Sequence, residues 1–281
     1  MHPLRLMLAG LTLSLGLSWN VSHAAGCGGE VACELAGGTY FVAMPKDDAK
    51  GTLFFLHGWG GSGKGQMKNK GMIKAFNKAG YALIAPTGQP RGQGRSGYRW
   101  NAFAFEQFRD DVAFLRAVAD DAAARFGLPR ERMGLGGFSG GGMMAWRVAC
   151  DAPESFAAYL PVAGLLWRPL PEDCKGPVKM LHTHGWSDPV VPIEGRSVAG
   201  GRYTQGDLGV GLDLIRRANK CIKDDPDKYD VSGAMWHRTW TKCQEGSALE
   251  YVLHPAGHKV PRGWYAVALE WLARVGITPA L

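Results

Sequence analysis

The decisive stretch of the sequence is Met133-Gly134-Leu135-Gly136-Gly137-Phe138-Ser139-Gly140-Gly141-Gly142, in which a Gly-x-Ser-x-Gly motif separates a short apolar segment from a helical one. Between a strand and a helix this motif forms a sharp, strained turn that leaves the serine exposed at the strand tip. The free N–H of Gly140 and the dipole of the following helix would face an oxyanion forming there. We therefore predict Ser139 as a nucleophile and Gly140 as an oxyanion donor.

Apolar, β-rich segments alternate with amphipathic helical segments along the whole chain. The expected strands are 39–44, 52–57, 81–86, 133–136, 157–163, 178–184, 235–241 and 249–254. The expected helices are 71–78, 106–126, 141–150, 208–220 and 262–275. This alternation predicts an α/β fold with a mostly parallel central sheet and helices on both faces. The polar stretch Asp224–Asp230 is expected to be a surface loop.

The N-terminus has the layout of a secretory signal. Arg5 precedes an apolar run from Leu6 to Leu17, and Ser22-His23-Ala24 ends the segment with small residues. The run is too short to span a bilayer comfortably, so we expect removal of residues 1–24 and no stable membrane insertion. Retention as an anchor and a lipoprotein signal at Cys27 are the alternatives. The prediction is a secreted or periplasmic protein whose residues 25–281 form a single catalytic domain.

Six cysteines follow the predicted cleavage site, an even number in a chain bound for an oxidising compartment. Three disulfides are expected, and the simplest of the many possible pairings joins sequence neighbours: Cys27–Cys33, Cys150–Cys174 and Cys221–Cys243. Because no Cys-x-x-Cys occurs in the sequence, we expect no metal site of that kind.

The net charge is +7 in 281 residues, and the lysines and arginines are scattered. This distribution indicates a solvated basic surface and argues against nucleic acid as a partner. The stretch Gly58–Lys64 fits the start of a phosphate-binding loop, but Gly65 stands where a Ser or Thr should hold magnesium. We therefore expect no nucleotide and no cofactor.

A serine needs a base to remove its proton and an acid to orient that base, and in this fold order both follow the serine. Asp188 comes just after one expected strand and His258 just after another, at the same sheet edge as Ser139. His237 and His254 are alternatives to His258, and Asp207 and Asp213 are alternatives to Asp188. The two histidines fall within expected strands and the two aspartates at a helix start, where packing and capping roles are usual.

The second oxyanion donor should come from the loop after the 52–57 strand, which begins His57-Gly58-Trp59-Gly60. We choose the backbone N–H of Trp59, with that of Gly60 as the alternative. His182 and His184 resemble a metal pair by spacing, but on a buried strand one of them more simply supports the Asp188 loop.

These ordered motifs resemble the secreted polyhydroxybutyrate depolymerase and feruloyl esterase group of α/β-hydrolases. The resemblance is carried by His57-Gly58, Asp110-Asp111, Gly137 to Met143, Val162-Ala163-Gly164, His184-Gly185 with Asp188, and Gly257-His258. It implies the α/β-hydrolase fold and hydrolysis of a carboxylic ester, small or polymeric. Members often carry an aromatic residue and a proline after the histidine, whereas Lys259-Val260-Pro261 follow here, which leaves polyester, feruloyl and acetyl substrates open.

Four tryptophans near expected strand ends, Trp59, Trp100, Trp167 and Trp186, are candidates to line the substrate cleft. Each could equally be a core residue. The expected mechanism is two-step acyl transfer by Ser139, His258 and Asp188. A serine peptidase of the same fold and a non-catalytic secreted carbohydrate-binding protein are the rival interpretations.

Overall fold

The computed structural model describes residues 26–92, 94–103 and 105–277 of the chain. The predicted signal segment and its cleavage site therefore lie outside the described residues. Among the helices within these ranges, none is both long and apolar enough to cross a membrane.

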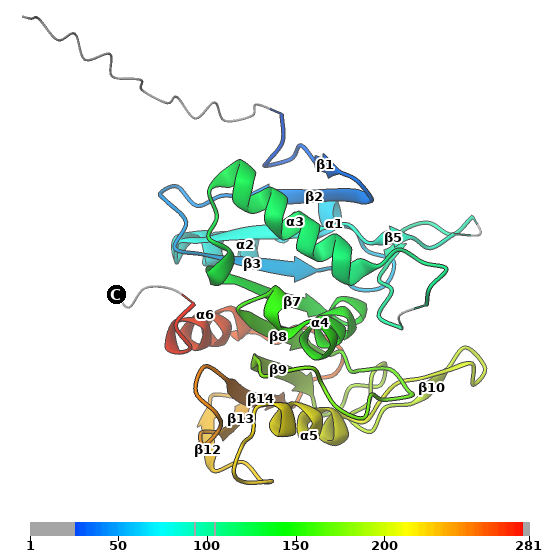
Figure 1. Ribbon diagram of the computed structural model, residues 1–281, viewed down its shortest axis with the longest axis vertical. Coiled ribbons are helices and arrows are strands. Elements are labelled where there is room, and N and C mark those ends of the chain that lie inside the picture. The colour runs from blue at the N-terminus through cyan, green and yellow to red at the C-terminus, as the bar shows by residue number, and fades with distance from the viewer. Residues whose placement is uncertain (1–25, 93, 104, 278–281) are drawn as a thin grey trace, which may run out of the picture.

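A ten-stranded sheet forms the centre of the described structure (Figure 1). Its strand order is β1 (Cys33–Leu35), β2 (Gly38–Ala43), β4 (Tyr81–Pro86), β3 (Gly51–Leu56), β7 (Met133–Phe138), β8 (Ala158–Val162), β9 (Lys179–Gly185), β14 (Ala248–His254), β13 (Met235–Trp240) and β12 (Lys228–Ser232). The strands from β4 to β14 are parallel to one another, and the outer strands at both edges are antiparallel. The central strand β3 is buried along its whole length, as expected for a parallel strand covered on both faces.

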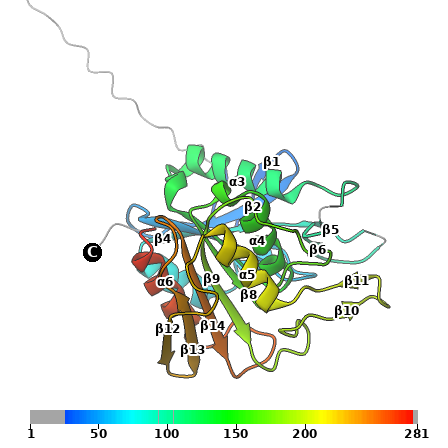
Figure 2. The same cartoon turned by 60° about the horizontal axis from the view of Figure 1, so that its bottom comes forward.

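Helices cover both faces of the sheet (Figure 1, Figure 2). Buried side chains of α3 (Asp111–Phe126), α4 (Gly140–Asp151) and α5 (Leu208–Ala218) pack into the larger core on one face. Those of α2 (Lys70–Lys78) and α6 (Trp264–Arg274) pack into a second core on the other face. The short helix α1 (Gly63–Gln66) and the 3₁₀ turns Arg130–Arg132 and Pro153–Ser155 complete the helical elements described. This architecture confirms the predicted α/β fold class.

Two small hairpins project from the end of the molecule at which the parallel strands terminate (Figure 1, Figure 2). One pairs β5 (Gln89–Pro90) with β6 (Tyr98–Arg99), and the other pairs β10 (Ser197–Val198) with β11 (Tyr203–Thr204). Each has only two residues per strand, too few to give a periodic signal in the sequence.

Two secondary-structure predictions differ from the structure by more than two residues. The helix expected from residue 106 begins at Asp111, because the Asp110 carboxylate accepts hydrogen bonds from the N–H groups of Val112 and Ala113 and so caps the first turn. The stretch Asp224–Asp230, expected to be a loop, runs into the exposed edge strand β12 at Lys228. There the backbone pairs with β13 although the side chains are mostly polar.

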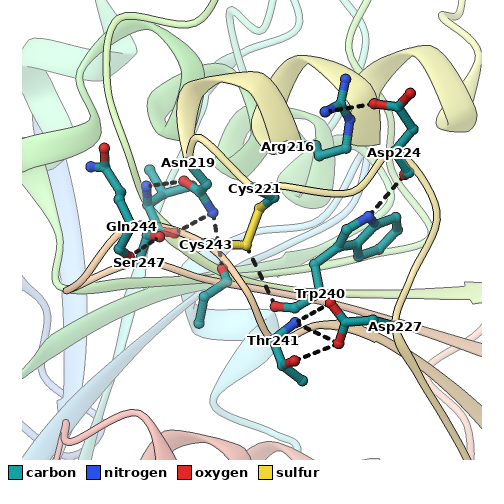
Figure 3. The surroundings of a disulfide bond; sticks show 12 residues. Arg216, Asn219, Cys221, Asp224, Asp227, Trp240, Thr241, Cys243, Gln244 and Ser247 are labelled. Carbon is teal, nitrogen blue, oxygen red and sulfur yellow. Dashed lines mark hydrogen bonds and ion pairs between the residues drawn. A yellow bond between two sulfur atoms is a disulfide. The ribbon is translucent and has the colours of Figure 1, made fainter.

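The structure contains three disulfides, and each joins sequence neighbours: Cys27–Cys33, Cys150–Cys174 and Cys221–Cys243. The Cys221–Cys243 bridge ties the end of α5 to the segment after β13 (Figure 3). Around it the indole N–H of Trp240 donates to the carbonyl of Asp224, and the buried amide of Asn219 bonds to the backbone of Val178. The bridge therefore sits within a hydrogen-bonded junction between α5 and the antiparallel edge of the sheet.

Candidate active site

Ser139 occupies a strained turn between β7 and α4. Its backbone has φ 55° and ψ −119°, a conformation that residues other than glycine rarely adopt. Two hydrogen bonds hold it: the Ser139 N–H donates to the Val162 carbonyl at 2.9 Å, and the Ser139 carbonyl accepts from Met143 N–H at 2.8 Å. The hydroxyl is thereby presented at the carboxyl end of β7.

The turn needs glycine where other backbone segments approach it. A Cβ atom on Gly141 would overlap the carbonyl of Leu56 at the end of β3. A Cβ on Gly164 would lie 2.6 Å from the Ser139 carbonyl oxygen. The glycines around Ser139 thus let α4 start directly against the ends of β3 and β8.

Ser139, His258 and Asp188 form one hydrogen-bonded chain. His258 Nε2 lies 2.9 Å from Ser139 Oγ, and His258 Nδ1 lies 2.7 Å from Asp188 Oδ2. The Asp188 side chain is fully buried, and the ring of Phe138 packs against that of His258 with centroids 4.8 Å apart. The structure therefore brings together the three residues that were predicted from loops far apart in the sequence.

Backbone contacts hold the acid in place. The other oxygen of Asp188, Oδ1, accepts hydrogen bonds from the N–H groups of Val190 and Val191, each at 2.9 Å. Gly257 packs close to the Ser187 carbonyl, where an added Cβ would lie only 3.3 Å from that oxygen. Both oxygens of Asp188 therefore have hydrogen-bond partners. The loops that carry Asp188 and His258 are also in contact with each other.

Two backbone N–H groups meet beside Ser139. A Cβ built on Gly140 would lie 3.4 Å from the Trp59 nitrogen, so the loop after β3 lies against the first residue of α4. Within the described part of the chain, neither the Trp59 N–H nor the Gly140 N–H has a hydrogen-bond acceptor. The alternative donor, the Gly60 N–H, is already bonded to the Tyr98 carbonyl at 2.9 Å. The Trp59 N–H is therefore a better candidate than the Gly60 N–H for the second oxyanion donor.

The ring of His57 stabilises this loop, a role that the sequence pattern did not indicate. His57 Nε2 accepts from the N–H of Gly88 at 3.0 Å, so the proton lies on Nδ1, which donates to the Gly58 carbonyl at 2.8 Å. Burial lowers the pKa of His57 to about 4, which keeps the ring neutral at pH 7. Trp100 donates its indole N–H to the His57 carbonyl at 2.9 Å.

Trp100 differs from the expectation that it lines the cleft. It is 5% exposed and packs against the His57 ring, because its indole N–H finds a backbone acceptor inside the protein. Trp59 and Trp186 are 56% and 66% exposed. The Trp59 ring carries the Arg91 guanidinium over its face at 4.8 Å.

Trp167 lines a cavity of about 1020 Å³, whose walls include residues of the segments 102–103, 105–108, 166–171 and 202–204. Its ring stacks on Phe103 with centroids 4.2 Å apart, and the ring of Tyr203 also contacts Phe103, with centroids 4.8 Å apart. Three arginines also line the cavity: Arg147, Arg168 and Arg202. Ser139 does not line this cavity.

The alternative residues have other partners. His237 bonds to Glu250 at 2.7 Å, and Asp207 caps α5 by accepting from the Val210 N–H. Asp213 pairs with Arg216 and Arg217, and His254 lies within β14. None of these four is part of the hydrogen-bonded chain that ends at Ser139. Over the described ranges, no cluster of three or more His, Cys, Asp or Glu side chains could hold a metal ion.

Comparisons with known proteins agree with this fold. Residues 51–190 match a family model described as alpha/beta hydrolase fold. The chain is similar to a solved acetyl xylan esterase from Aspergillus awamori, with a TM-score of 0.58 and 15% identity over 84% of this chain and 94% of that one. The chain therefore has the α/β-hydrolase fold.

Sequence relatives carry esterase names. The protein named as the esterase NocK of Nocardia uniformis subsp. tsuyamanensis is 35% identical over 151 residues, which cover 51% of this chain but only 42% of that protein. A protein named as a feruloyl esterase C of Aspergillus niger is 25% identical over 269 residues, 88% of each chain. Both relatives are named as esterases, and this chain spans less than half the length of the first of them.

Proposed function

We propose that this protein is a serine carboxylic-ester hydrolase in which Ser139 is the nucleophile, His258 the general base and Asp188 its orienting acid. The observation that carries the proposal is the continuous hydrogen-bonded chain from Asp188 through His258 to Ser139, next to two N–H groups that lack acceptors in the described structure. Such an arrangement suits a reaction in which a hydroxyl attacks a carbonyl and negative charge develops on its oxygen.

The reaction has two steps. His258 Nε2 takes the proton as Ser139 Oγ bonds to the ester carbonyl carbon, and Asp188 stabilises the resulting imidazolium. The N–H groups of Trp59 and Gly140 donate to the tetrahedral oxyanion, each contributing about 3 kcal/mol. The C–O bond to the alcohol then breaks, and His258 returns the proton to the leaving oxygen. Water attacks the acyl-enzyme with the same base and frees Ser139.

The substrate is proposed to be a feruloyl or acetyl ester of a polysaccharide, or a polyhydroxyalkanoate-type polyester. Feruloyl esters have the most support, because relatives covering most of this chain are named as feruloyl esterases. The exposed rings of Trp59 and Trp186 could contact an extended substrate.

We further propose that residues 1–24 are removed on export and that residues 25–281 form the mature single-domain enzyme. The three disulfides support a secreted or periplasmic location, since such bonds persist in oxidising compartments.

A substrate panel tests the function. We expect the protein to hydrolyse p-nitrophenyl butyrate and methyl ferulate, with acetylated xylan and polyhydroxybutyrate film measured in parallel. Ser139→Ala is the control and should be inactive on every ester. Equal turnover by the wild type and Ser139→Ala would refute the assigned nucleophile, and no turnover of any ester by the wild type would refute the function.

A further inference from the structure

Three aromatic side chains outside the proposed catalytic residues form a buried hydrogen-bonded series. The indole N–H of Trp146 donates to His182 Nδ1 at 3.0 Å, and His182 Nε2 lies 3.0 Å from His184 Nδ1. His184 Nε2 in turn lies 2.7 Å from the carbonyl oxygen of Val191. Trp146 is on α4, and the two histidines point to the same face of β9.

The two ends of this series determine where its protons lie. An indole nitrogen can only donate, so His182 Nδ1 must accept. A carbonyl can only accept, so His184 Nε2 must donate. If both rings are neutral, His182 carries its proton on Nε2 and donates to His184 Nδ1, and every bond in the series is satisfied. A protonated His184 would carry a second proton on Nδ1, which would face the Nε2–H of His182. If His182 moved its proton to Nδ1 to avoid this, Trp146 would lose its acceptor.

The surroundings agree with neutral rings. His182 and His184 are completely buried, and burial lowers the pKa of both. The nearest carboxylate oxygen, Asp188 Oδ2, is 3.6 Å from His184 Nε2, too far for a hydrogen bond. Glu194, His254 and His258 are the other titratable groups that influence His184 electrostatically.

The far end of the series touches the proposed catalytic acid. Val191 accepts from His184 through its carbonyl and donates through its N–H to Asp188 Oδ1 at 2.9 Å. The near end lies on α4, the helix that begins directly after Ser139. The series therefore connects the helix of the proposed nucleophile to the loop of the proposed acid, behind the direct chain through His258.

We propose that Trp146, His182 and His184 form a hydrogen-bonded relay in which each proton has a fixed position. These three positioning residues fix the Asp188 loop relative to Ser139. This inference rests on the proposed function for its catalytic consequence, but not for the order of its protons. His184 donates to the carbonyl of Val191, and the N–H of Val191 donates to Asp188 Oδ1. These two bonds fix the carboxylate so that Asp188 Oδ2 stays in line with His258 Nδ1.

The proton order can be measured directly in the wild-type protein by ¹⁵N nuclear magnetic resonance of the imidazole rings. We expect His182 and His184 to be Nε2–H tautomers that stay neutral between about pH 5 and pH 8, the range in which an unperturbed histidine titrates. Their signals are assigned by loss in single-residue variants. An Nδ1–H tautomer, or titration of either ring in this range, would overturn the relay.

Kinetics of ester hydrolysis test the positioning role. His184→Phe keeps a buried ring but removes both hydrogen bonds, and should lower kcat on the order of 10²-fold with little change in KM. Trp146→Phe removes only the terminal donor and should cost less. His184→Gln can still donate to the Val191 carbonyl and should recover part of the loss.

His237→Phe is the matched control, because it removes a partly buried histidine that bonds to Glu250 on β14 and leaves Glu250 its ion pair with Arg274. It should keep kcat near the wild-type value. Equal kcat values for His184→Phe and His237→Phe would refute the positioning role. Ser139→Ala distinguishes the proposed function from the relay. Its loss of turnover tests the proposed nucleophile, whereas its His182 and His184 signals should be unchanged because the proton order does not depend on catalysis.

Discussion

His258 Nε2 and Ser139 Oγ lie 2.9 Å apart although 119 residues separate them in the chain. Their contact depends on β7 and β14 ending at the same edge of the sheet. If the two side chains act as one unit, His258→Ala should lower kcat by on the order of 10⁵- to 10⁶-fold, about as much as Ser139→Ala. Steady-state kinetics of the two single variants and the double variant check this.

The double variant is informative because removal of one member leaves the other without a role. Its kcat should equal that of either single variant. Losses that multiply in the double variant would mean that Ser139 and His258 act independently.

Asp188→Asn should fold normally but lower kcat by about 10⁴-fold, because an amide can support the wrong tautomer of the neighbouring histidine. The N–H groups of Val190 and Val191 can still donate to the amide oxygen. The measurement is kcat together with the thermal unfolding temperature. A fully active Asp188→Asn variant would exclude this residue as the orienting acid.

Gly140 and Gly141 should respond differently to alanine. In Gly141→Ala the new methyl group would overlap the Leu56 carbonyl, so we expect a loss of several kcal/mol of folding stability or no folded protein. In Gly140→Ala the methyl group would approach the Trp59 nitrogen at 3.4 Å, so the protein should fold with reduced kcat. Urea unfolding and ester hydrolysis distinguish the two variants. An unchanged kcat in Gly140→Ala would argue against an oxyanion role for the N–H groups of Gly140 and Trp59.

His57 should make folding stability depend on pH. Its pKa is about 4 in the folded protein against 6.5 for an unperturbed histidine, so the unfolded chain takes up the proton first as the pH falls. The free energy of unfolding should therefore decrease between about pH 6.5 and pH 4, with this side chain accounting for about 3 kcal/mol. Urea unfolding of wild type and His57→Gln at several pH values measures the difference, and identical pH slopes would contradict it.

The Cys221–Cys243 bridge should stabilise the fold without acting in catalysis. It closes a loop between residues 22 positions apart, for which the loss of unfolded-state entropy corresponds to about 3 kcal/mol. The Cys221→Ser/Cys243→Ser double variant should unfold at lower urea concentration and keep its kcat at temperatures where it is folded. A kcat that falls with an unchanged urea midpoint would point to a direct role in the site.

The fold class and the three residues of the hydrogen-bonded chain could be predicted because each has a local signal. Ser139 lies in a glycine-rich turn between a strand and a helix, and Asp188 and His258 each follow an apolar strand. The common edge of a parallel sheet then brings such loops together.

Other features depend on contacts that only the folded chain defines. The expected helix start at residue 106 followed the apolar spacing, but the cap at Asp110 decides the observed start. Trp100 is buried because the His57 carbonyl offers its indole an acceptor. The relay through Trp146 and His182 requires that α4 pack beside β9, which no local pattern reveals.

The assignment of Ser139 as nucleophile is tested most directly by mass spectrometry after reaction with a fluorophosphonate. The proposed mechanism predicts a single adduct, located on Ser139, with loss of ester hydrolysis in proportion to labelling, and no adduct on Ser139→Ala. Labelling of Ser139→Ala to the same extent as the wild type, or an adduct on another residue of the wild type, would contradict it.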